Sequence, residues 1–98
     1  MSTALSETAV QEALKSLSGW EYADGMISKT YEFPQYLAGV AFASAVGVVC
    51  EGLDHHPDLT ISYRKVRVEL TTHDAGNSIT QRDIDTARAI ENLGYPKR

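Results

Sequence analysis

Cysteine is almost absent from this sequence, which has Cys50 alone among 98 residues. A single cysteine cannot form a disulfide within the chain, so no disulfide framework supports the fold or indicates secretion. Cys50 lies in an apolar run, where we expect a small buried side chain. A nucleophilic thiol would need an activating base held close to it.

The chain also lacks an excess of basic residues, with 9 Lys and Arg against 13 Asp and Glu. Nucleic-acid-binding domains carry basic patches, so we expect no nucleic-acid partner. Residues 1–5 lack the basic and apolar segments of a signal peptide. The longest apolar-rich stretch, Leu37 to Cys50, is shorter than the ~20 residues of a membrane helix. We therefore expect a cytoplasmic protein with no membrane partner.

Hydrophobic periodicity and turn signals predict a single domain, residues 1–98, with the order α-β-β-α-β-β-α. The predicted helices cover residues 6–18, 35–54 and 80–93, and the predicted strands cover 20–23, 26–33, 59–63 and 66–70. Gly19 ends the first helix, while Gly94 and Pro96 end the last. Because hairpin-connected strands favour antiparallel pairing, the expected fold class is α+β. It has a four-stranded antiparallel sheet with three helices packed on one face.

The first two strands flank Asp24-Gly25, a pair that favours a type I′ hairpin because glycine readily takes positive φ. Period-two spacing places Ile27, Lys29, Tyr31 and Phe33 on one face of the second strand.

The central helix has apolar residues nearly all round, and Pro34 suits its first turn. A helix without a clear polar face is usually covered on more than one side, so a second subunit is a candidate cover. Gly39, Ala43 and Gly47 are four residues apart, which would let a neighbouring backbone approach closely.

The most informative stretch is residues 51–58, because it contains two of the three histidines of the chain. Pro57 disfavours helical geometry in His56, so the helix should end near His55, where the macrodipole favours a protonated imidazole. His73 follows the strand that ends near Leu70. Topology thus allows the three histidines to converge at one end of the sheet.

Converging histidines suit acid and base chemistry, since unperturbed histidine titrates near pH ~6.5. Glu51, Asp54 and Asp83 could bias which imidazole is the acid. Asp83 also fits the third position of a capping box that begins at Thr80.

Simpler interpretations exist for each of these residues. The His-His pair could be a surface feature, His73 a loop residue, and the carboxylates solvated helix ends. A metal site is not expected, because adjacent side chains diverge and zinc sites use other spacings. Glycine-rich phosphate loops and Gly-x-Ser-x-Gly motifs are also absent from the sequence.

The chain resembles the pterin-4a-carbinolamine dehydratase family over nearly its whole length. The core of the resemblance is Glu51, His55-His56-Pro57, Tyr63, His73 and Asp83, at the family's spacings. Outside that core, Ser18-Gly19-Trp20, Lys29-x-Tyr31-x-Phe33-x-x-Tyr36, residues 72–76 and Thr80-x-Arg82-Asp83-Ile84 also match.

The resemblance implies dehydration of a 4a-hydroxytetrahydropterin to quinonoid dihydropterin, in pterin recycling. The pterin is the substrate and no cofactor is implied. By analogy, His55 and His73 would be the acid and base, and His56 would contact the pterin. Asp83 would orient a histidine, while Glu51, Asp54 and Pro57 would shape the pocket. The family forms homodimers with a continuous sheet, often paired into homotetramers.

Two departures from the family pattern stand out. Leu59 occupies a position where several members have Trp, and Asn77-Ser78-Ile79 replaces a typical Gly-Leu with one extra residue before Thr80.

Two alternatives to the enzyme remain open. One is a non-catalytic interaction protein on the same scaffold, as for relatives that bind a transcription factor or assist Rubisco assembly. The other is a metal-dependent hydrolase.

Overall fold

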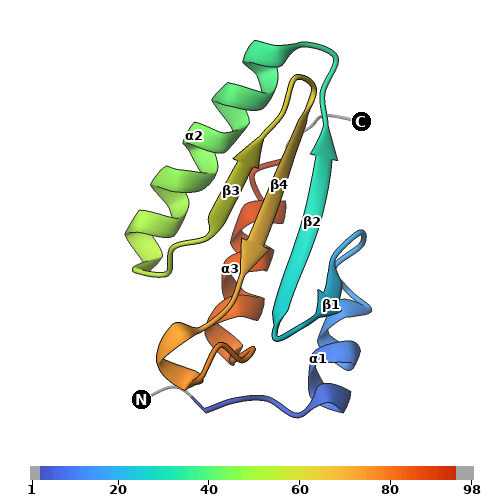
Figure 1. The fold of residues 1–98 in the computed structure, drawn as a ribbon, viewed down its shortest axis with the longest axis vertical. Helices are drawn as coiled ribbons and strands as arrows, with labels where there is room; N and C mark the ends of the chain where they lie inside the picture. Colours follow the sequence, from blue (N-terminus) through green and yellow to red (C-terminus); the bar gives the residue numbers. More distant parts are fainter. Residues whose placement is uncertain (1–2, 95–98) are drawn as a thin grey trace.

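The computed structural model describes residues 3–94 and confirms the predicted order of helices and strands (Figure 1). The elements are α1 (Glu7–Leu14), β1 (Glu21–Ala23), β2 (Met26–Glu32), α2 (Tyr36–Leu53), β3 (Asp58–Ile61), β4 (Lys65–Leu70), the 3-10 turn η1 (His73–Ala75) and α3 (Gln81–Glu91). The turn η1 lies in the connection between β4 and α3. The helix predicted to run to residue 18 is shorter, because α1 ends at Leu14.

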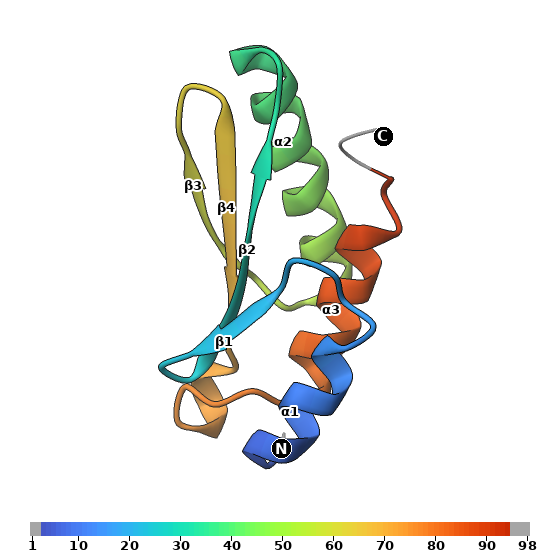
Figure 2. The same cartoon turned by 90° about the vertical axis from the view of Figure 1, so that its right-hand side faces the viewer.

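The four strands form one antiparallel sheet in the order β1-β2-β4-β3. All three helices lie on the same side of this sheet (Figure 2), which confirms the α+β class and the single helical layer. Side chains that face the helices are buried, as the predicted face of β2 shows with Ile27, Lys29, Tyr31 and Phe33. Apolar side chains from every helix and from β4 complete this core, among them Val10, Phe42, Val46, Val66, Val68, Leu70, Ile84 and Ile90.

The β1–β2 turn has the predicted type I′ character, with φ of 53° at Asp24 and 76° at Gly25. It also supports the loop that follows β4. Thr71 Oγ1 donates a 2.7 Å hydrogen bond to the Gly25 carbonyl. A Cβ on Gly25 would lie 2.3 Å from the Asn77 carbonyl oxygen, so only glycine fits this close approach.

One side of α2 packs on the sheet, with Phe42, Val46 and Cys50 wholly buried. The opposite side is uncovered, since Leu37 and Val48 are 70% and 71% exposed. By length and composition alone this 18-residue helix could cross a membrane, although core helices pass the same test. The sequence predicted that α2 is covered on more than one side. Within residues 3–94, the protein covers one side of it.

Two details of α2 differ from the predictions. Pro34 precedes the N-cap, Gln35, and so lies outside the first turn. The small residues Gly39, Ala43 and Gly47 were predicted to let a neighbouring backbone approach, but the atoms near Gly39 belong to side chains of the protein's own sheet and β2–α2 connection. A Cβ at Gly47 would meet no atom within 4 Å. Of these two glycines, only Gly39 is needed for close packing within the described part of the chain.

The last helix, α3, begins with the predicted capping box between Thr80 and Asp83. It ends at Glu91, and Gly94 beyond it has a φ of 74°, while Pro96 lies outside the described residues. Glu91 Oε2 accepts hydrogen bonds from Trp20 Nε1 at 3.2 Å, from Lys29 Nζ at 2.9 Å and from the Tyr31 hydroxyl. This cluster ties the end of α3 to β2.

The pKa of Glu91 reflects these contacts. Burial by itself would raise it, but the donors Lys29, Tyr31 and Trp20 and the charge of Lys29 together lower the pKa below its ordinary value of 4.5. Glu91 is therefore ionised over the physiological range.

Candidate active site

The site begins where α2 ends. The helix ends at Leu53 because Asp54 adopts a left-handed conformation, with φ of 54°. The His55 amide then donates to the Cys50 carbonyl at 3.1 Å, the six-to-one bond of a Schellman motif. The predicted helix end near His55 is thus two residues too late. Asp54, as well as Pro57, directs the two histidines out of the helix.

His55 turns inward and pairs with Asp83 in the first turn of α3. His55 Nε2 lies 2.6 Å from Asp83 Oδ1, and the two residues are 7% and 0% exposed. The same carboxylate closes the capping box, since its Oδ2 accepts from the Thr80 amide at 2.9 Å. The extra residue before Thr80 therefore does not keep Asp83 from reaching a histidine.

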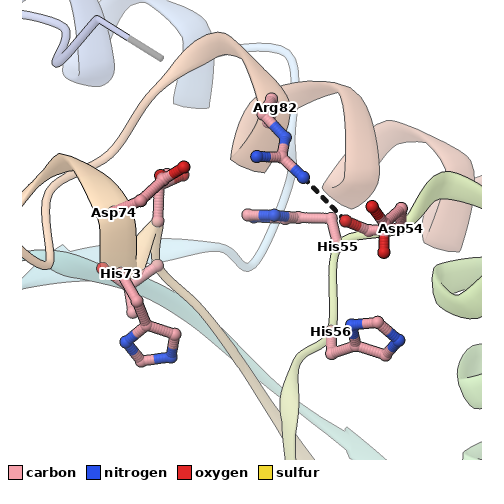
Figure 3. Close-up of a pocket in the computed structure, with 8 residues that line it drawn as sticks. Asp54, His55, His56, His73, Asp74 and Arg82 are labelled. Carbon is pink, nitrogen blue, oxygen red and sulfur yellow. Dashed lines mark hydrogen bonds between the residues drawn. The ribbon is translucent and has the colours of Figure 1, made fainter. Parts of the chain in front are cut away.

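His56 points the other way, toward Glu51 and away from His73 (Figure 3). Its Nε2 lies 2.7 Å from Glu51 Oε1, and the two side chains are 60% and 78% exposed. Such exposed pairs contribute less than about 1 kcal/mol to stability. Its partner therefore orients His56 without fixing it rigidly.

His73 opens the turn η1 directly after β4. Its Nδ1 lies 2.8 Å from Asn77 Oδ1, within a loop closed by a backbone bridge between Thr72 and Ser78. Asn77 has a left-handed φ of 58°, which asparagine tolerates better than most residues. The departure from the family pattern at Asn77 thus supplies the partner of His73.

The three histidines line one open cavity of about 240 Å³, as the sequence suggested (Figure 3). The lining residues are Asp54, His55, His56, Thr71, Thr72, His73, Asp74 and Arg82. Of the other predicted site residues, Asp83 lies behind His55 and Glu51 holds His56. Pro57 does not line the cavity.

Sequence reasoning missed four lining residues: Thr71, Thr72, Asp74 and Arg82. Thr72, Asp74 and Arg82 lie in segments that match the family, and Thr71 directly precedes one of them, so the family match was the available signal. Arg82 Nη2 donates a 2.6 Å bond to the Asp54 carbonyl, which joins the start of α3 to the end of α2. This bond closes one side of the cavity, next to the His55 ring (Figure 3).

Cys50 lies close in sequence but is not part of this chemistry. It is wholly buried, as predicted, and burial raises the pKa of its thiol to about 11. Within residues 3–94, no group of three or more His, Cys, Asp or Glu side chains is arranged to hold a metal ion.

Comparison with known proteins adds independent information. The sequence profile of the family described as Pterin 4 alpha carbinolamine dehydratase matches residues 3–93. A protein of Natronomonas pharaonis is 46% identical, over 95% of this chain and 98% of its own length. One of Roseiflexus sp. is 41% identical, over 95% and 99%. Both are named, provisionally, pterin-4-alpha-carbinolamine dehydratases.

Two solved structures share the fold. A crystal structure from Brucella melitensis, titled transcriptional coactivator/pterin dehydratase, has a TM-score of 0.85 and 32% identity, over 93% of this chain and 98% of that chain. A pterin dehydratase-like protein identified as a RuBisCO assembly factor has a TM-score of 0.64 and 20% identity, over 79% and 90%. At that identity the second likeness concerns the fold alone.

Proposed function

Since this chain belongs to the pterin 4 alpha carbinolamine dehydratase family, we propose that it is a hydro-lyase acting on a pterin carbinolamine. The reaction removes water from a 4a-hydroxytetrahydropterin and gives the quinonoid dihydropterin, as a step of pterin recycling. The observation that carries the proposal is the convergence of His55, His56 and His73 on one open cavity. The pterin is the substrate, and the proposed chemistry uses neither a cofactor nor a metal ion.

The chemistry needs two proton transfers. An acid protonates the hydroxyl that leaves C4a, and a base accepts the proton of N5, so that water departs as the new double bond forms. His55 and His73 are our candidates, because each has one ring nitrogen held by the protein. Asp83 holds Nε2 of His55 and Asn77 holds Nδ1 of His73. The described residues leave the second nitrogen of each ring without a hydrogen-bond partner, available to a substrate.

The other predicted residues take supporting roles in this proposal. His56, held by Glu51, contacts the pterin from the exposed rim of the cavity. Asp83 orients His55, and Asp54 shapes the wall to which Arg82 is bonded.

Stopped-flow dehydration of 4a-hydroxytetrahydropterin generated in situ tests the proposal. We expect the wild type to accelerate the reaction, and His55→Ala and His73→Ala each to lose on the order of 10²–10⁴-fold in rate. Thr30→Ala, an exposed position on the helix-free side of the sheet, is the matched control and should keep wild-type activity. No acceleration over the buffer rate by folded wild type would exclude the dehydratase. Partner pull-downs would then test the alternative of a non-catalytic interaction protein. Its parallels are the Brucella melitensis protein titled transcriptional coactivator/pterin dehydratase and, at the level of fold alone, the RuBisCO assembly factor.

We further propose that the protein is a cytoplasmic homodimer or homotetramer without nucleic-acid or membrane partners. Uncovered apolar side chains support the association: Tyr36, Leu37, Val48 and Leu53 on α2, and Ile61 and Tyr63 at the end of the edge strand β3. Light scattering should give the mass of two or four chains for wild type. Val48→Glu should lower this mass, whereas Lys15→Glu, directly after α1, should leave it unchanged. A monomeric wild type would contradict the proposal.

A further inference from the structure

A buried hydrogen-bond network extends behind His55. Thr72 Oγ1 donates to Asp83 Oδ2 at 2.7 Å and lies 2.8 Å from Thr80 Oγ1. The exposed fractions of Thr72, Thr80 and Asp83 are 1%, 2% and 0%. Because water does not reach these groups, the protein itself must satisfy each donor and acceptor.

The direction of every proton in this network follows from counting donors. An ionised carboxylate only accepts, so the single hydroxyl proton of Thr72 goes to Asp83. The Thr72 oxygen can then only accept from Thr80, whose proton is thereby assigned as well. The Thr80 oxygen in turn accepts from the Arg82 amide at 3.2 Å.

The carboxylate is consequently fixed at both oxygens. Oδ2 accepts from both the Thr72 hydroxyl and the Thr80 amide. Oδ1 then accepts from His55 Nε2–H. This arrangement places the ring proton of neutral His55 on Nε2 and leaves Nδ1 as its basic atom.

Solvent access agrees with this assignment. Every buried side-chain nitrogen or oxygen among the described residues has a hydrogen-bond partner. Nδ1 of His55 has no such partner within these residues, so it is not buried. Nδ1 is therefore the nitrogen of the ring that reaches solvent, and His55 itself lines the cavity.

We propose that Thr72 is a positioning residue for the dehydration, because its hydroxyl proton fixes the Asp83 carboxylate and thereby the tautomer and ring orientation of His55. The role of Thr72 in catalysis rests on the proposed function. The effect of Thr72 on the tautomer of His55 does not depend on that function. An experiment can therefore test the catalytic role and the effect on the tautomer separately.

The test compares Thr72→Val, which removes the hydroxyl at nearly constant volume, with Thr72→Ser, which keeps it. Thr86→Val is the matched control, since Thr86 is also a buried threonine, and its hydroxyl donates to the Arg82 carbonyl and not to Asp83. The first measurement is the ¹⁵N chemical shifts of the His55 ring, which report the tautomer without substrate. The second is kcat and KM for dehydration.

We expect Nε2–H on His55 in wild type, Thr72→Ser and Thr86→Val, and a mixture of tautomers in Thr72→Val. The kcat of Thr72→Val should fall on the order of 10-fold with KM changed by less than about two-fold, and Thr72→Ser should restore it.

Nδ1–H on His55 in the wild type would overturn the proposal even if Thr72→Val fails to fold. So would a Thr72→Val variant that keeps both the tautomer and the kcat of Thr86→Val. If the wild type does not turn over, the proposed function fails, and the tautomer measurement alone decides whether Thr72 controls His55.

Discussion

His55 and Asp83 lie 28 residues apart in the chain, yet Nε2 of one is 2.6 Å from Oδ1 of the other, in a buried position. One residue follows the end of α2 and the other lies in the first turn of α3. The pair therefore joins the two helices at the base of the cavity, and it gives the carboxylate two duties. Asp83 caps α3 through Thr80 and orients the imidazole of His55.

Asp83→Asn should separate these duties, because the amide keeps the shape of the carboxylate but loses its charge. A neutral amide can present either oxygen or nitrogen to His55, so the tautomer is no longer fixed. We expect dehydratase kcat to fall by roughly 10²-fold or more, by analogy with the aspartate of catalytic triads. Asp85→Asn, at an exposed position of the same helix, is the control. A folded Asp83→Asn variant with wild-type kcat would show that His55 needs no anionic partner.

His56→Ala should have a much smaller effect than His55→Ala. His56 is mostly exposed, and its partner, Glu51, is exposed as well. We expect KM to rise a few-fold, by roughly 1 kcal/mol of binding, with kcat nearly unchanged. The free energy of unfolding should change by less than about 1 kcal/mol. Steady-state kinetics and urea unfolding measure the two quantities, and a kcat loss as large as that of His55→Ala would place His56 in the proton-transfer step.

Glu91→Gln should destabilise the protein by about 1–3 kcal/mol at pH 7, because three donors lose a charged acceptor. The pKa of Glu91 is lowered in the folded protein, so its contribution is complete above the unfolded value of 4.5 and disappears as pH falls through the lower folded value. Urea unfolding at pH 7 and below pH 4.5 should therefore show a larger difference between wild type and variant at pH 7.

Glu12→Gln provides the control for this comparison, since Glu12 forms only an exposed pair with Lys15. Its effect should stay within about 0.5 kcal/mol at either pH. An equal difference between wild type and Glu91→Gln at the two pH values would contradict the assigned role of the Glu91 cluster.

Substitutions of Asp54 test whether its main role is in the reaction or in the left-handed turn that ends α2. Its φ of 54° is a conformation that glycine adopts without strain. Asp54→Gly should thus preserve or raise stability by up to about 1 kcal/mol, whereas Asp54→Ala should lower it by a similar amount. Thermal unfolding separates these outcomes. Near-wild-type kinetics in Asp54→Gly would assign Asp54 to the turn, and a large kcat loss there would assign its carboxylate to the reaction.

Periodicity and turn chemistry determined much of this protein from the sequence alone. The order of elements, the buried face of β2, the Asp24-Gly25 turn and the capping box at Thr80 all depend on interactions within a few residues. The sequence also indicated the three histidines as candidate acid and base residues, because of their residue type and their expected place at one end of the sheet. The length of α1 was misjudged because Leu17 is buried by a turn that follows the helix, at a spacing that resembles one more helical turn.

Only the tertiary structure decided which partner each histidine has. Asp83 binds His55, Glu51 binds His56 and Asn77 binds His73, and the first pair depends on how α3 packs beside the end of α2. The left-handed turn at Asp54 sends adjacent histidines in different directions, which composition and spacing do not reveal. Thr72 is an ordinary threonine in the sequence. It acquires its proposed role because folding removes water from around Asp83, so that the Thr72 hydroxyl, together with the Thr80 amide and His55, must satisfy the carboxylate.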